Sequence, residues 1–145
     1  MEFQTIGEVK KYFRTIRFEQ LEIIRMLEMI ERKETGLLPK AIVYNKDKVQ
    51  TSPEDFLAKN EAEIVDLTKL MQAKAAELRK KKTEAEKIVE SLERPGERDV
   101  MRMYYLDLKK DYRLYRWEEV AAKLGYTMRH TLRLHSDALE RIISR

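Results

Sequence analysis

Apolar side chains recur at alternating steps of three and four residues near the start of the chain: Ile6, Val9, Phe13, Ile16, Ile23, Leu27 and Ile30. This spacing predicts an amphipathic helix over residues 6–34 with a single heptad seam. Gln20 is the only polar residue in that seam. Thr5 and Glu8 have the spacing of a capping box, which predicts the start of the helix, and Gly36 predicts its end.

A second apolar series predicts a longer helix over residues 53–92, because one apolar residue falls every seven positions: Leu57, Ile64, Met71, Leu78, Ala85 and Leu92. Ser52 and Pro53 supply an N-cap and a first helical residue. Residues 36–52 form the connection, in which Pro39 prevents a continuous helix. The two helices are therefore predicted to form a coiled-coil-like antiparallel hairpin.

The two predicted helices differ in length, so the end of the second should extend beyond the hairpin. Its last apolar residues would then need another partner: Ala85, Ile88, Val89 and Leu92. The sequence leaves two alternatives for the partner that covers these residues, the C-terminal domain and a second copy of the chain. The second alternative predicts a homo-oligomer.

A domain boundary is predicted at Arg94-Pro95-Gly96, where proline and glycine break the long helix. Residues 1–94 would form the helical hairpin, for oligomerisation or interaction, and residues 95–145 a small domain. A further helix begins after the break, with Val100 and Tyr104 at helical spacing, and a charged loop follows at residues 107–115. The predicted fold class is all-α.

A helix-turn-helix is predicted from Trp117 to the end of the chain. Ala121 is small where two helices would cross, and Gly125 stands four residues later, where the turn needs a positive φ. Thr127 is an N-cap for the second helix. Three apolar residues can form the core shared by both helices: Val120, Leu124 and Leu134.

The second helix of such a motif enters the DNA major groove. Its inward face would carry Thr131, Leu134, Ala138 and Ile142. The candidate DNA-binding residues are Thr127, Met128, Arg129, His130, Leu132, Arg133 and Ser136. Arg129 and Arg133 share one face, and arginine is the commonest reader of guanine. The alternative is a solvated face whose charged residues serve solubility. Leu132 is unfavourable on such a face unless it contacts a thymine methyl group or a neighbouring protein.

Composition adds limits to this hypothesis. Of the 145 residues, 39% are charged, and the net charge of +4 permits nucleic-acid binding without requiring it. The chain has no cysteine, and its two histidines are five residues apart, which does not fit a helical metal pair. The basic run 79–82 could follow a phosphate backbone or form a solvated face.

We expect no catalytic residues, no metal and no cofactor, hence no enzyme. With no signal peptide or apolar span, we expect a cytoplasmic protein that does not insert into membranes.

Several stretches carry a resemblance to known families. From residue 97 onward they are Glu97–Tyr105, Trp117–Ala121, Leu124–Thr127 and Ala138–Leu139. These resemble region four of bacterial sigma factors. The interior stretches 40–44 and 49–53 resemble the connection in ArpU/RinA-type phage late transcriptional regulators. Thr131 and Leu132 depart from the sigma pattern, which usually has an aliphatic residue and a polar residue there.

The resemblance implies a phage or prophage transcription regulator that acts in a bacterial host and binds double-stranded DNA, with host RNA polymerase as a further partner. It places the recognition helix over residues 127–136. A non-enzymatic interaction module is the alternative. In that case a degenerate helix-turn-helix would accompany long helices that bind RNA polymerase, a sigma factor or a phage assembly protein.

Overall fold

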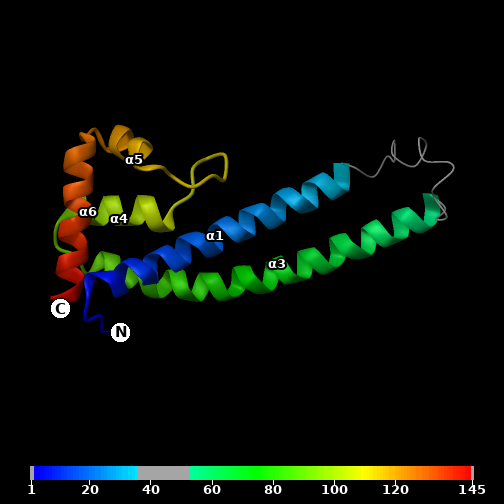
Figure 1. The fold of residues 1–145 in the computed structure, drawn as a ribbon, viewed down its shortest axis with the longest axis horizontal. Helices are drawn as coiled ribbons and strands as arrows, with labels where there is room; N and C mark the ends of the chain where they lie inside the picture. The colour runs from blue at the N-terminus through cyan, green and yellow to red at the C-terminus, as the bar shows by residue number, and fades with distance from the viewer. Residues whose placement is uncertain (1, 36–52, 145) are drawn as a thin grey trace. The chain divides into compact units, whose positions relative to one another are not determined.

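The computed structural model describes residues 2–35 and 53–144 of the chain. Its elements are α1 (Ile6–Thr35), α3 (Pro53–Glu90), α4 (Pro95–Met101), the π-helix η1 (Arg102–Leu106), α5 (Trp117–Leu124) and α6 (Met128–Ile143) (Figure 1). The described residues contain no strand, only an isolated bridge between Leu108 and Leu114. The prediction of an all-α fold is confirmed. The predicted connection, with Pro39 and Ser52, lies outside the described residues.

The chain divides into two compact units, which the long helices α1 and α3 both enter. One unit comprises Met1–Leu21 with Glu77–Arg145, and the other comprises Glu22–Ala76. The first unit therefore joins the beginning of α1 and the end of α3 to the helices that follow Pro95. This division does not follow the predicted boundary at residue 94, because the small C-terminal helices share their core with the ends of the hairpin.

The unit Glu22–Ala76 is a pair of antiparallel helix segments. The Lys33 ammonium lies 2.6 Å from the Glu63 carboxylate, and Asn60 donates a hydrogen bond to the Lys33 carbonyl. Lys74 pairs with Glu22 at 3.3 Å. These pairs fix which faces meet, although exposed ion pairs of this kind contribute only about 0–1 kcal/mol each.

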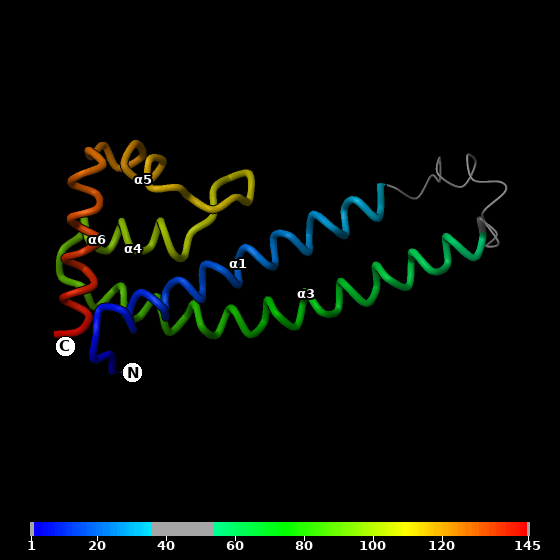
Figure 2. Tube along the Cα trace, in the orientation of Figure 1, coloured from blue at the N-terminus to red at the C-terminus, as the bar shows by residue number. Residues whose placement is uncertain are grey.

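The larger unit contains most of the buried apolar residues. From α1 it buries Val9, Phe13 and Ile16, and from the end of α3 and the turn after it Ala85, Val89 and Leu92. The start of α1 and the end of α3 run side by side in this unit (Figure 2). Hydrogen bonds from Lys81 to Glu19 and from Lys82 to Gln20 join them there. The residues expected to extend beyond the hairpin are thus covered by the chain itself. This removes the reason for expecting self-association through that stripe.

The predicted start of α1 is confirmed by its hydrogen bonds. The Thr5 hydroxyl accepts from the Glu8 N–H at 3.2 Å, and the Glu8 carboxylate accepts from the Gln4 N–H at 2.8 Å. α3 ends at Glu90, two residues before the predicted end, within the usual uncertainty of helix termini. Leu92 nevertheless stays in the core because the chain turns there, with its N–H bonded to the Val89 carbonyl.

The π-helix η1 was not predicted, and side chains of α1 account for its stability. The Asp107 N–H donates to the Arg102 carbonyl at 2.9 Å, which is the i→i−5 pattern of this helix. Gln20, only 3% exposed, donates to the Tyr105 carbonyl at 2.8 Å. Arg17 donates to the Tyr104 carbonyl at 2.5 Å. The single polar residue of the α1 seam therefore satisfies a buried backbone group.

The predicted charged loop is a tight hairpin-like turn tied to α5. Lys109 donates its N–H to the Arg113 carbonyl, and Tyr112 at the tip has a positive φ of 62°. The Lys109 ammonium also pairs with Glu119 of α5, which in addition accepts from the Arg116 N–H. These hydrogen bonds, chiefly the one from Lys109, lower the pKa of Glu119 to about 2. The loop thereby holds the first turn of α5 in place.

Candidate nucleic-acid interface

The turn between α5 and α6 has the geometry that the sequence predicts. Gly125 has a φ of 74°, in the left-handed region that favours glycine. The Tyr126 N–H donates to the Ala121 carbonyl and the Gly125 N–H to the Ala122 carbonyl, a Schellman motif. The Thr127 hydroxyl then accepts from the His130 N–H at 3.1 Å and caps α6. Helix, turn and helix are all confirmed.

The core beneath this motif joins α4, α5 and α6. Buried residues Val100 and Val120 form it together with Tyr115, and Leu124 and Leu134 pack against it. Ala121 is buried, as expected where the two helices cross. Thr131 is also buried, and its hydroxyl donates to the Thr127 carbonyl at 2.9 Å. A threonine can replace the aliphatic residue expected there because its only polar group is satisfied within α6.

α6 has two distinct faces, as predicted. Thr131, Ala138 and Ile142 are buried, and Leu134 is half-buried. The candidate DNA-binding residues lie on the other side, where Thr127, Met128, Arg129, Leu132, Arg133 and Ser136 are exposed. The exposed fraction of Leu132 is 42% and that of Met128 is 37%, so this face is partly apolar. His130 is half-buried, with its ring edge-on to Tyr126 at 4.9 Å.

An aromatic layer joins α6 to α5, η1 and α1. Trp117 stacks on Tyr104 with ring centroids 3.7 Å apart, and the Arg17 guanidinium covers the Tyr104 ring at 3.9 Å. His135 packs edge-on to Trp117 and shares a hydrogen bond of 2.7 Å with the Tyr105 hydroxyl. Trp117 therefore anchors the C-terminal helices and, through Tyr104 and Arg17, brings them against α1.

Burial dominates the electrostatics of this layer. It lowers the pKa of His135 to about 4, and the nearby positive charges of Lys10 and Arg14 contribute to the shift. The imidazole is therefore neutral at pH 7. Burial also raises the pKa of Tyr105 to about 12. Neither of these two groups carries charge at neutral pH.

A cleft of about 240 Å³ opens between the exposed face of α6 and the first turns of α1. Leu132 and Ser136 of α6 line it, together with Lys10 and Arg14 of α1 and with Trp117. Sequence reasoning missed Lys10 and Arg14. Their spacing of four residues predicts a shared helix face, but no sequence pattern indicates that this face adjoins a helix more than a hundred residues away.

The basic run at residues 79–82 is only partly available to a ligand. Lys81 pairs with Glu19 at 2.6 Å, and Lys82 donates to the Gln20 side chain. Arg79 and Lys80 are exposed. Half of the run therefore joins α3 to α1, which neither the solvated-face hypothesis nor the phosphate hypothesis anticipated.

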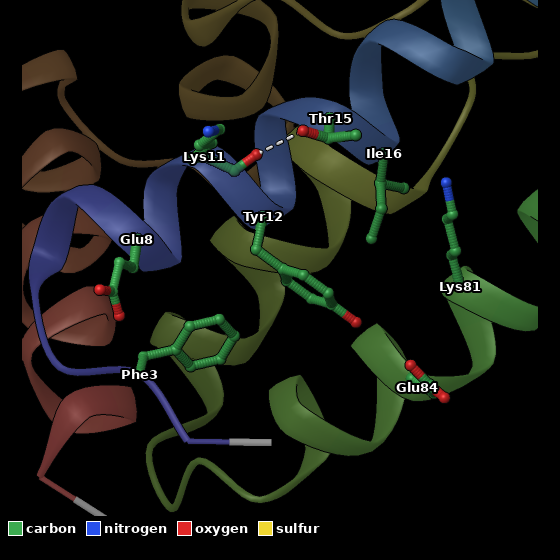
Figure 3. A pocket seen from close by; sticks show the side chains of 8 residues that line it. All are labelled: Phe3, Glu8, Lys11, Tyr12, Thr15, Ile16, Lys81 and Glu84. Carbon is green, nitrogen blue, oxygen red and sulfur yellow. Dashed lines mark hydrogen bonds between the residues drawn. The ribbon is translucent and has the colours of Figure 1, made fainter.

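A second and larger hollow of about 440 Å³ lies between the N-terminal segment, α1 and α3 (Figure 3). Phe3, Tyr12 and Ile16 give it a mainly apolar lining, and Lys81 and Glu84 lie at its α3 side. The Tyr12 hydroxyl points toward α3 and has no hydrogen-bond partner among the described residues. Burial, followed by the Glu84 charge, raises the pKa of Tyr12.

Comparisons of the chain with protein-family models, with curated proteins and with solved structures find no match. Among the residues that the structure describes, no group of histidine, aspartate and glutamate side chains could hold a metal ion. In the same part of the chain, no helix combines the length and the apolar character that a membrane crossing requires.

Proposed function

We propose that the protein is a sequence-specific DNA-binding transcription regulator whose recognition helix is α6. The observation that supports this most strongly is the exposure of Arg129 and Arg133 on one face of the second helix of a complete helix-turn-helix. Arginine donates two hydrogen bonds to the O6 and N7 atoms of guanine, and each good pair discriminates by about 1–3 kcal/mol. The resemblance to phage late regulators and to sigma region four points to the same function.

The exposed apolar residues of α6 have a place in this proposal. Leu132 lies between the two arginines in sequence and is 42% exposed. In the major groove it can contact the C5 methyl group of thymine, which is the apolar feature of that groove. Ser136, one turn further along α6, can donate to a phosphate or a base edge.

The proposal is tested by selecting bound fragments from a source-genome library and measuring affinity by fluorescence anisotropy. The double variant Arg129→Ala/Arg133→Ala should bind the selected fragment at least about tenfold more weakly, since each lost base contact costs about 1–3 kcal/mol. Arg25→Ala/Lys69→Ala is the matched control, because it removes the same charge from exposed positions in the other unit. If the first double variant binds like the wild type, the recognition surface is misassigned.

A protein-interaction module is the second candidate, and the exposure of Leu132 and Met128 favours it. In that case α6 would dock on RNA polymerase, a sigma factor or a phage assembly protein. A titration with phage and unrelated DNA at low salt separates the two candidates, because phosphate contacts make any DNA binding strongly salt-dependent. Absence of salt-dependent binding to either DNA would favour the interaction module.

A further inference from the structure

The cleft beside α6 brings a second helix to the face proposed to bind DNA. Lys10 and Arg14 of α1 line it together with Leu132 and Ser136 of α6, so positive side chains of α1 adjoin the exposed face of α6. All of these residues belong to the same compact unit. The eight residues that line the cleft include no aspartate or glutamate.

The described part of the chain does not neutralise Lys10 and Arg14 with a carboxylate. Neither makes an ion pair or a side-chain hydrogen bond among the described residues, whereas Arg141 pairs with Glu97 at 2.6 Å. Two cations without carboxylate partners create a positive potential that attracts an anion. His135, which lines the same cleft, has its pKa lowered by burial and then by the charges of Lys10 and Arg14.

We infer that Lys10 and Arg14 bind the phosphate backbone of the DNA whose bases α6 contacts, which makes α1 a second DNA-binding element. The inference rests on the proposed function. A helix in the major groove has phosphates of both strands on either side of it, and an element beside that helix faces one of those strands. Such contacts hold the protein in position without reading sequence. The aromatic layer, which packs α1 against α5 and α6, fixes their distance from the recognition helix.

The test measures affinity as a function of salt for the wild type and for Lys10→Gln/Arg14→Gln. Each phosphate contact contributes about 0.9 to the slope of log affinity against log salt. Between about 50 and 200 mM salt, the affinity of the double variant should therefore fall about twelvefold less than that of the wild type. The loss of affinity should be equal on the selected fragment and on unrelated DNA of the same length.

Two comparisons make the result specific. Arg25→Gln/Lys69→Gln removes the same net charge from the other unit and should leave the salt slope unchanged. In Lys10→Gln/Arg14→Gln, the pKa of His135 followed by NMR should rise, because two charges that lower it are gone. An upward shift with retained Trp117 fluorescence shows that the cleft is still folded.

The possible results separate this inference from the proposed function. An unchanged salt slope in Lys10→Gln/Arg14→Gln, with binding still lost in Arg129→Ala/Arg133→Ala, overturns the inference and leaves the proposed function standing. If Lys10→Gln/Arg14→Gln loses affinity for the selected fragment but not for unrelated DNA, Lys10 and Arg14 contact bases and not phosphates. That result also overturns the inference. If the wild type binds neither DNA, both proposals fail, and an acidic protein surface becomes the ligand to test on the cleft.

Discussion

Replacing Arg17 with methionine tests whether the start of α1 is an integral part of the helix-turn-helix unit. Arg17 donates one hydrogen bond to the Tyr104 carbonyl and another, at 2.8 Å, to the Tyr115 carbonyl. Its guanidinium also covers the Tyr104 ring. Methionine keeps most of the apolar stem and removes all of these interactions, so the effect of the change is mainly polar.

The expected loss of stability follows from these contacts. Hydrogen bonds to charged groups contribute about 1.5–3 kcal/mol each, and a cation–π contact contributes about 0.5–2 kcal/mol. Arg17 is half-buried, so solvent replaces part of what is lost. We expect the free energy of unfolding of Arg17→Met to fall by about 3 kcal/mol. For a unit of this size, that corresponds to a fall in Tm of about 12–24 °C.

The assay is urea denaturation followed by the fluorescence of Trp117, the only tryptophan of the chain. Trp117 stacks on the ring that Arg17 covers, so the probe reports on the perturbed site. Arg17→Lys should lose less stability, because it keeps the charge but not the two-pronged donor. Arg25→Met, an exposed position on the same helix, should behave like the wild type. A midpoint for Arg17→Met equal to that of Arg25→Met would refute the assignment of α1 to this unit.

Four further changes test other parts of the larger unit. Arg141→Met should lower the free energy of unfolding by about 3 kcal/mol, because it leaves the fully buried Glu97 carboxylate without its cation. The double variant Glu97→Leu/Arg141→Met should recover most of this loss. Thermal unfolding monitored by circular dichroism measures both. Because burial lowers the pKa of His135 from 6.5 to about 4, the unfolded chain binds a proton in that window that the folded chain does not. The contribution of His135 to the free energy of unfolding should then be constant above about pH 7 and fall by about 3 kcal/mol toward pH 4. Urea midpoints of His135→Gln, measured over the same pH range, should not show this fall. Gly125→Ala should cost about 1–2 kcal/mol through its positive φ alone, since no atom lies within 4 Å of the added Cβ, and Gly125→Asn should cost less. Tyr12→Phe should keep or raise the Tm, whereas a fall would show that the hydroxyl has a partner in solution.

The helices could be predicted from the sequence because local signals and long apolar series agree on them. Thr5, Pro95, Gly125 and Thr127 mark helix ends through their own backbone chemistry, and the structure confirms all four positions. The two faces of α6 follow from its helical period in the same way. Predictions that depend on one segment alone were therefore accurate, and so was the pairing of the two long helices as an antiparallel hairpin.

Contacts between particular side chains of distant segments could not be predicted from one sequence. Glu97 looks like an ordinary surface carboxylate, yet it is fully buried beside Arg141, which lies forty-four residues later. Lys10 and Arg14 belong to the candidate site only because α1 packs beside α6. The partner of the end of α3 was left open for the same reason, since an apolar stripe does not identify what covers it.

Gln20 shows how a polar residue in an apolar seam can determine the way two segments fit together. Its amide donates to the Tyr105 carbonyl and accepts from Lys82, so both of its polar ends are satisfied in one arrangement of α1, α3 and η1. Sliding α1 by one turn would put Ile16 or Ile23 opposite that carbonyl, and neither can donate a hydrogen bond. The buried carbonyl would then cost about 1–3 kcal/mol, which disfavours the shifted registers more than an all-apolar seam would. Because the same helix carries Lys10 and Arg14, the hydrogen bond that fixes its register also fixes where those two charges lie relative to α6.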